Sequence, residues 1–142
     1  MKGPIVVGTD GSPTATKAVL EAIALAKAFD APLHIISAFR PVPVHTDELP
    51  PEFASTVNSR SEVDAILADV GSRARQAGVK TEVHAETGDA ANAILALAEQ
   101  LDADLIVIGN KGLGSMRRFL LGNVPSKVVH HSPCSTHIVH TT

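Results

Sequence analysis

The chain has 142 residues, of which 44% are hydrophobic and 19% charged, and its formal net charge is −3. This length suits one ordinary domain with a substantial core, which we expect to span residues 1–142. No apolar run approaches the ~20 residues needed to cross a bilayer, and the first residues lack the apolar core of a secretory signal. The single cysteine, Cys134, excludes an internal disulfide. We therefore expect a cytoplasmic protein with no membrane partner.

Apolar runs and helical periodicities alternate along the first part of the chain. Residues 5–7 form a short apolar run typical of a buried strand. A helix is predicted over residues 13–29, with Ser12 as its N-cap and proline at its first position. Residues 33–38 predict a second strand. Residues 40–51 contain four prolines, so we expect a long loop there that acts as a lid, a binding loop or a mobile segment.

The same alternation continues to the end of the chain. The periodicity of residues 63–74 predicts a helix that stops at Gly78, and residues 79–85 predict a strand at a sheet edge. Gly88 and Asp89 open a third helix. The remaining predicted elements are a strand over 105–108, a short helix over 123–130 and a strand over 136–140. This order predicts an α/β fold, a five-stranded parallel sheet with helices on both faces.

The most informative segment follows the fourth predicted strand. Glycine without a side chain lets backbone N–H groups approach a ligand closely, and such groups at a loop and a helix start form an anion site. All 15 acidic residues lie at or before Asp104, which leaves the region after it free of negative side chains. The segment therefore predicts a phosphate or nucleotide site. It reads Gly109-Asn110-Lys111-Gly112-Leu113-Gly114-Ser115 and is followed by Gly122-Asn123-Val124-Pro125-Ser126.

Two common phosphate-binding loops are excluded. No G-x-x-x-x-G-K-[ST] string occurs, and the first strand is followed by Gly8-Thr9-Asp10-Gly11-Ser12 in place of G-x-G-x-x-G. Ligands of a parallel α/β sheet bind beyond the carboxyl ends of the strands, where the strand order reverses. The candidate loops are residues 9–12, 38–40 and 109–114.

The combined pattern resembles the universal stress protein family. It consists of Gly109-x2-Gly112-x9-Gly122, the Gly8–Ser12 loop, and Asp102–Gly109 before the glycines. The resemblance covers essentially the whole chain. It implies the ATP-binding branch of that family, with the adenine nucleotide alpha hydrolase-like fold and strand order 3-2-1-4-5.

The resemblance also implies which residues line the nucleotide site. Asp10 would lie near the ribose and the metal–phosphate group, so Mg²⁺ is expected only together with ATP. The alternative is that Asp10 is a turn carboxylate that helps to start the first helix. Adenine would lie against Ala38 and Phe39, with residues 7–9 beneath it, although Phe39 has the alternative of a core or lid residue. The predicted set is Val7, Gly8, Thr9, Asp10, Ala38, Phe39, Ile108, Gly109, Asn110, Lys111, Gly112, Gly114, Gly122, Asn123, Val124, Pro125 and Ser126.

The chain departs from the family pattern after the third glycine, where the family has Ser or Thr. Asn123 can cap the short helix and donate through its side-chain amide. Pro125, however, has neither an N–H nor a hydroxyl, so one donor to the phosphates is missing, and Ser126 substitutes only in part. We expect weaker ATP binding or a ligand with fewer phosphates, and AMP and cyclic AMP stay open.

These features predict a nucleotide-binding regulatory module of the stress-response type, with no catalytic residue and no nucleic-acid partner. The alternative is a slow ATP hydrolase, which needs a base that positions water near the γ-phosphate. Besides Asp10 the sequence offers no obvious base, so the binding module is preferred. A weaker alternative is a ligand-free dimeric interaction protein, against which the glycine motif argues.

The seven histidines do not predict a zinc site. His130-His131 and His137-x-x-His140 lack cysteine or carboxylate ligands at suitable spacing, and a strand turns residues three apart to opposite faces.

The last predicted strand, Thr136–His140, predicts a homodimer. It bears no Lys, Asp, Glu or Pro, which usually protect an exposed edge, so it invites pairing with a second copy. Family dimers commonly pair through this strand. The alternative is that the proline-rich loop covers the edge.

Overall fold

The computed structural model describes residues 2–39, 59–111 and 123–141. Its strands are β1 (Ile5–Gly8), β2 (Leu33–Phe39), β3 (Thr81–Thr87), β4 (Leu105–Gly109) and β5 (Ser135–Val139). Its helices are α1 (Pro13–Phe29), α3 (Arg60–Gln76), α4 (Ala90–Leu101) and α5 (Asn123–His131). Every strand and helix predicted within these ranges is present.

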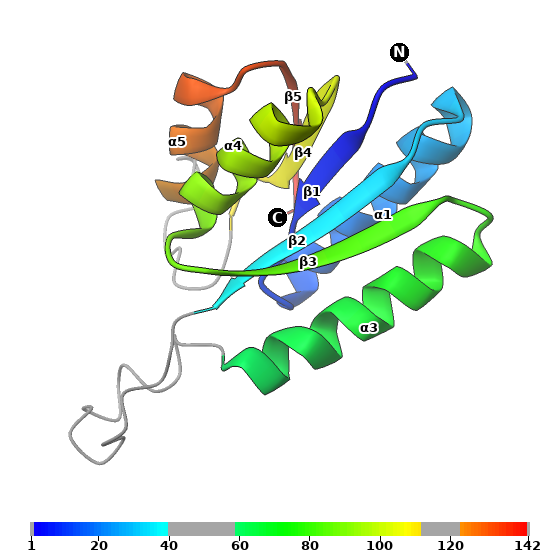
Figure 1. The fold of residues 1–142 in the computed structure, drawn as a ribbon, viewed down its shortest axis with the longest axis horizontal. Coiled ribbons are helices and arrows are strands. Elements are labelled where there is room, and N and C mark those ends of the chain that lie inside the picture. The colour runs from blue at the N-terminus through cyan, green and yellow to red at the C-terminus, as the bar shows by residue number, and fades with distance from the viewer. Residues whose placement is uncertain (1, 40–58, 112–122, 142) are drawn as a thin grey trace.

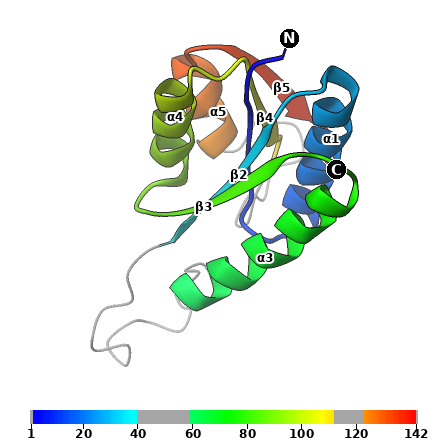
Figure 2. The ribbon, with the colours of Figure 1, turned by 45° about the vertical axis from the view of Figure 1, so that its right-hand side comes forward.

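The five strands form one parallel sheet in the order β3-β2-β1-β4-β5. Helices α1 and α3 cover one face, and α4 and α5 cover the other (Figure 1). The turned view in Figure 2 shows the sheet between these two helical layers. The predicted fold class and strand order are confirmed, with β3 and β5 at the two edges.

The core lies on both faces of the central strands. Val7 of β1 packs with residues of α1 and α3, whereas its neighbour Val6 packs with residues of α4. Both are fully buried. Burial on both faces explains why β1 and β4 read as continuous apolar runs instead of alternating patterns.

Local hydrogen bonds set the helix ends. Ser12 Oγ accepts a 3.1 Å hydrogen bond from the N–H of Ala15, which confirms Ser12 as the N-cap of α1. Asp89 caps α4 in the same way, through the N–H of Asn92 at 3.0 Å. Helix α1 ends at Asp30 in the left-handed conformation, with φ at 55°. A short polar side chain tolerates that conformation better than most.

Strand β3 lies two residues later than the sequence predicts. The N–H of Val79 donates to the carbonyl of Ala74 at 3.1 Å, so Val79 belongs to the turn after α3. The ladder with β2 begins where Leu33 pairs with Thr81. Within the described residues, no helix combines the length and apolar character needed to cross a bilayer.

Candidate functional site

The order of the strands reverses at β1, which lies between β2 and β4. The carboxyl ends of these three strands therefore meet at one edge of the sheet. The N–H of Thr9 donates to the carbonyl of Ile36 at 3.0 Å, and Ser37 Oγ donates to the carbonyl of Thr9 at 2.7 Å. The residue that follows β1 is thus fixed against the end of β2.

Asp10 lies in a tight turn between β1 and α1. Its Oδ1 accepts a 2.9 Å hydrogen bond from the N–H of Ser12, and Thr9 Oγ1 accepts one from the N–H of Gly11 at 3.1 Å. Gly11 has φ at +83°, and a Cβ there would lie 2.5 Å from Ile66 Cδ1, so only glycine suits this position. The structure confirms the turn role of Asp10, and its role toward a nucleotide is taken up below.

The end of β4 is tied to the chain that follows β5. The N–H of Asn110 donates to the carbonyl of Val139 at 2.9 Å. Asn110 Oδ1 accepts hydrogen bonds from both the N–H and the Oγ1 of Thr141, at 2.9 and 2.8 Å. The side-chain oxygen of Asn110 is therefore used within the fold.

The loop after β4 also reaches the start of α1. Lys111 is only 7% exposed, and its carbonyl accepts a 3.5 Å hydrogen bond from Thr14 Oγ1. This contact holds the loop after β4 against the first turn of α1, which directly follows the loop after β1. A Cβ on Gly109 would lie 3.3 Å from Thr141 Cγ2, so a side chain there would press against the neighbouring residues.

Several predicted floor residues belong to the core. The side chains of Val7 and Ile108 are buried in the two hydrophobic clusters. A Cβ on Gly8 would lie 2.5 Å from Ile94 Cδ1. The absence of a side chain at Gly8 therefore lets helix α4 pack closely against β1. These residues can contact a ligand only through backbone atoms.

Phe39 ends β2 and is half-buried beside Ala38. It packs against the core on the α1 and α3 side, and its contact with adenine stays a prediction. The guanidinium carbon of Arg60 lies 5.1 Å from the centroid of its ring, close enough for a cation–π interaction. Sequence reasoning missed Arg60. The only signal for it was a cation that follows the predicted proline-rich loop.

The glycines Gly112, Gly114 and Gly122 lie outside the described residues, as does the proline-rich loop. Helix α5 opens with Asn123 exposed, Val124 and Ser126 half-buried, and Pro125 buried. A proline is tolerated there because N–H groups of the first turn have no acceptor within the helix.

One charged contact links α5 to the start of α4. Lys127 Nζ lies 3.3 Å from Asp89 Oδ2. The positive charge of Lys127 is thus partly paired with the residue that caps α4.

Comparison with known proteins decides the family. A model of the universal stress protein family matches residues 1–140. The chain belongs to the universal stress protein family. The predicted resemblance is therefore confirmed.

Relatives in this family align along nearly the full length. Universal stress protein Rv1636 of Mycobacterium tuberculosis is 38% identical over 143 residues, covering 97% of this chain and 96% of the relative. Universal stress protein MJ0531 of Methanocaldococcus jannaschii is 35% identical over 138 residues, covering 95% of this chain and 80% of the relative. A crystal structure of a universal stress protein in complex with cAMP is 34% identical, with a TM-score of 0.77, and covers 99% of this chain and 98% of that one.

Proposed function

We propose that this universal stress protein binds an adenine nucleotide at the carboxyl edge of its sheet and acts as a regulatory module. The observation that carries the proposal is the contact between Thr14 and Lys111, which joins the start of α1 to the loop after β4, beside β1, where the strand order reverses. Ligands of parallel α/β sheets bind at such a point. The relative solved with cAMP, which aligns along 99% of this chain, supports an adenine nucleotide as the ligand.

In this proposal the phosphates lie against the Gly109-x2-Gly112-x9-Gly122 segment and the start of α5. The absence of a hydroxyl and an N–H at Pro125 removes one donor that a triphosphate would use. We therefore propose a ligand with fewer phosphates, AMP or cyclic AMP, ahead of ATP. Where ATP binds, we propose that Asp10 contacts the Mg²⁺ that accompanies it.

Slow ATP hydrolysis is the alternative function. It requires a carboxylate that is available to orient water at the terminal phosphate. Asp10 Oδ1 already accepts the N–H of Ser12 to shape the turn, which favours a structural role for this group. Measuring phosphate release from ATP at micromolar protein tests the hydrolase directly.

The proposal is tested first by absorbance. The chain has no Trp and no Tyr, so the protein itself absorbs little near 280 nm. A band near 260 nm in a preparation free of nucleic acid would report bound nucleotide, and mass spectrometry after acid release would name it. Calorimetric titration of the emptied protein with cAMP, AMP and ATP–Mg²⁺ then ranks the three.

The variant Asp10→Asn sharpens the test. Asparagine keeps an Oδ1 that accepts from Ser12, so the turn is preserved while the negative charge is removed. We expect ATP–Mg²⁺ affinity to fall and cAMP affinity to change little. Asp30→Asn, at the exposed end of α1, is the matched control and changes neither. Failure of all three nucleotides to bind the unaltered protein would overturn the proposal.

A further inference from the structure

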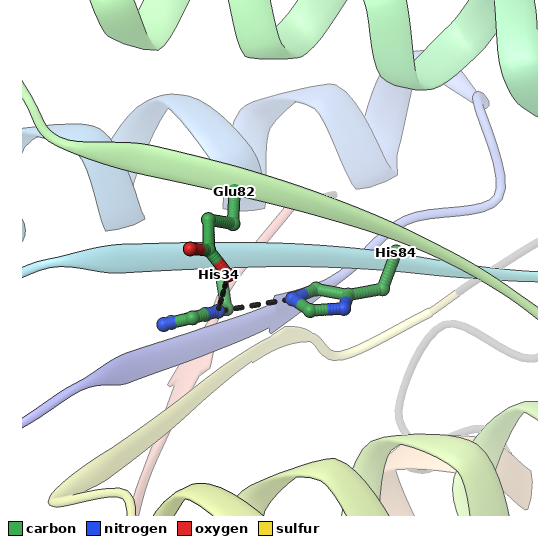
Figure 3. A group of neighbouring side chains, drawn as sticks. All are labelled: His34, Glu82 and His84. Atoms are coloured by element: carbon green, nitrogen blue, oxygen red, sulfur yellow. Dashed lines mark hydrogen bonds and ion pairs between the residues drawn. The ribbon is translucent and has the colours of Figure 1, made fainter.

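Three polar side chains gather on the sheet next to its β3 edge (Figure 3). His34 comes from β2, whereas Glu82 and His84 come from β3. The register pairs His34 with Glu82 and Ile36 with His84. Because alternate residues of a strand share a face, all three side chains lie on the face that α4 and α5 cover. Ile36, on the same face of β2, packs in the cluster that contains α4.

The ligand atoms of these side chains converge. His34 Nδ1 lies 2.9 Å from His84 Nε2 and 3.7 Å from Glu82 Oε2. The three atoms all lie within 4.8 Å of one another. The His34 side chain is 10% exposed and that of Glu82 is 69% exposed. The cluster is therefore anchored in the sheet on one side and open to solvent on the other.

We propose that His34, Glu82 and His84 bind a divalent transition-metal ion of the zinc type. Two imidazole nitrogens and one carboxylate oxygen are a ligand set that zinc accepts in proteins, with water in the fourth position. The register of β2 with β3 places the three residues side by side before any ion arrives. The exposed carboxylate of Glu82 gives the ion a path from solvent.

The distances require little rearrangement. Zinc with Zn–N bonds of about 2.0–2.1 Å holds two tetrahedral nitrogen ligands roughly 3.3 Å apart. The two imidazole nitrogens, 2.9 Å apart, need to separate by only a few tenths of an ångström. The rings are stacked, with centroids 5.2 Å apart, so small rotations of the side chains supply this movement.

The protonation state also suits a metal ligand. Burial and the neighbouring His84 lower the pKa of His34, and Glu82 opposes this effect only in part. The lowered pKa favours the neutral imidazole, which is the form that coordinates a metal. Without a metal, one imidazole donates a hydrogen bond to the other.

A bound ion would join the edge strand β3 to β2. The site is separate from the proposed nucleotide site, because His34 is the second residue of β2 and lies near its amino end. An ion that binds only the folded state raises the free energy of unfolding once its concentration exceeds Kd. Metal binding and nucleotide binding can therefore be tested independently.

The experiment uses the full chain after treatment with a chelator. Calorimetric titration with Zn²⁺ should show one ion per chain and a rise in Tm on binding. Co²⁺ should bind the same site and give d–d absorption bands, without the thiolate charge-transfer band that Cys134 would produce. His34 is left unchanged because it is buried, and its replacement would disturb the fold.

The decisive variants are His84→Gln and Glu82→Gln. We expect each to weaken Zn²⁺ binding at least tenfold and to remove most of the rise in Tm. The matched control is His137→Gln, which breaks another contact between a histidine and a glutamate, the 3.0 Å pair of His137 with Glu21. This control should bind Zn²⁺ as the unaltered chain does.

Three outcomes would overturn the proposal. They are no binding of Zn²⁺ by the unaltered chain, unchanged affinity in Glu82→Gln and His84→Gln, and an equal loss in His137→Gln. The second outcome would place the ion on exposed histidines such as His130 and His131 of α5.

Discussion

The side-chain oxygen of Asn110 accepts two hydrogen bonds from Thr141, from its N–H at 2.9 Å and from its Oγ1 at 2.8 Å. Both residues are buried, and together they join the end of β4 to the chain after β5. Asn110 is also one of the residues predicted to line the nucleotide site. These hydrogen bonds fix Asn110, the first residue after β4, against the chain that follows β5.

We expect Asn110→Ala to lower the free energy of unfolding by about 1–3 kcal/mol, because two buried donors of Thr141 lose their acceptor. Urea unfolding measures the effect. Asn92→Ala is the matched control, since Asn92 is exposed on α4 and such changes stay within about 0.5 kcal/mol. Equal stability of the two variants would show that the Asn110 contact contributes nothing.

The glycine motif makes a prediction for binding. Gly112→Val and Gly122→Val each place a branched side chain where backbone N–H groups should approach phosphate, so both should abolish nucleotide binding. Circular dichroism checks that the variants stay folded, and calorimetry with cAMP and ATP measures binding. Unchanged affinity in both folded variants would contradict the assignment of the motif.

A third prediction concerns the missing donor in α5. Pro125→Ser should strengthen ATP binding more than AMP binding, by on the order of 1.5–3 kcal/mol at best for a hydrogen bond to a charged acceptor. Pro125 is buried, so Pro125→Ala is needed to separate loss of the ring from gain of the hydroxyl. Equal effects on ATP and AMP would place this residue away from the terminal phosphates.

A fourth prediction concerns assembly through β5. We expect a homodimer in which the edge strands of two copies pair across a two-fold axis. Thr136→Lys should yield monomers, because a lysine in an edge strand opposes pairing. Proline at Val139 is a poorer test, since Val139 is buried and pairs with Gly109.

Sedimentation velocity at micromolar protein measures this assembly. Thr87→Lys, in the opposite edge strand β3, is the matched control and should remain dimeric. A monomeric unaltered protein, or a dimeric Thr136→Lys, would rule out pairing through β5.

The fifth prediction is a pH dependence at Cys134. Burial raises the pKa of this thiol above its ordinary value. Alkylation by iodoacetamide should therefore need a higher pH in the folded protein than in urea. The unfolded chain loses its thiol proton first, so this group lowers stability as the pH rises past about 8.5. Identical pH profiles in the two states would contradict the shift.

The sequence by itself determined the fold class, the element order and the loops at the candidate site. Strands and helices were predictable because burial on two faces gives continuous apolar runs, and burial on one face gives helical periodicity. The helix starts at Ser12 and Asp89 were predictable because each side chain accepts a hydrogen bond from the backbone N–H only three residues later in the sequence. The strand order came from the resemblance to a known family.

The tertiary structure alone decided which distant residues meet. The start of β3 depends on the turn that Val79 closes and on the ladder with β2, so the local pattern placed it two residues early. The contacts of Asn110 with Thr141 and of Arg60 with Phe39 join separate elements. His34 and His84 are fifty residues apart in sequence, and only the register of β2 with β3 brings their nitrogens together. A local sequence pattern carries no information about strand register, because register is set by the packing of the whole sheet.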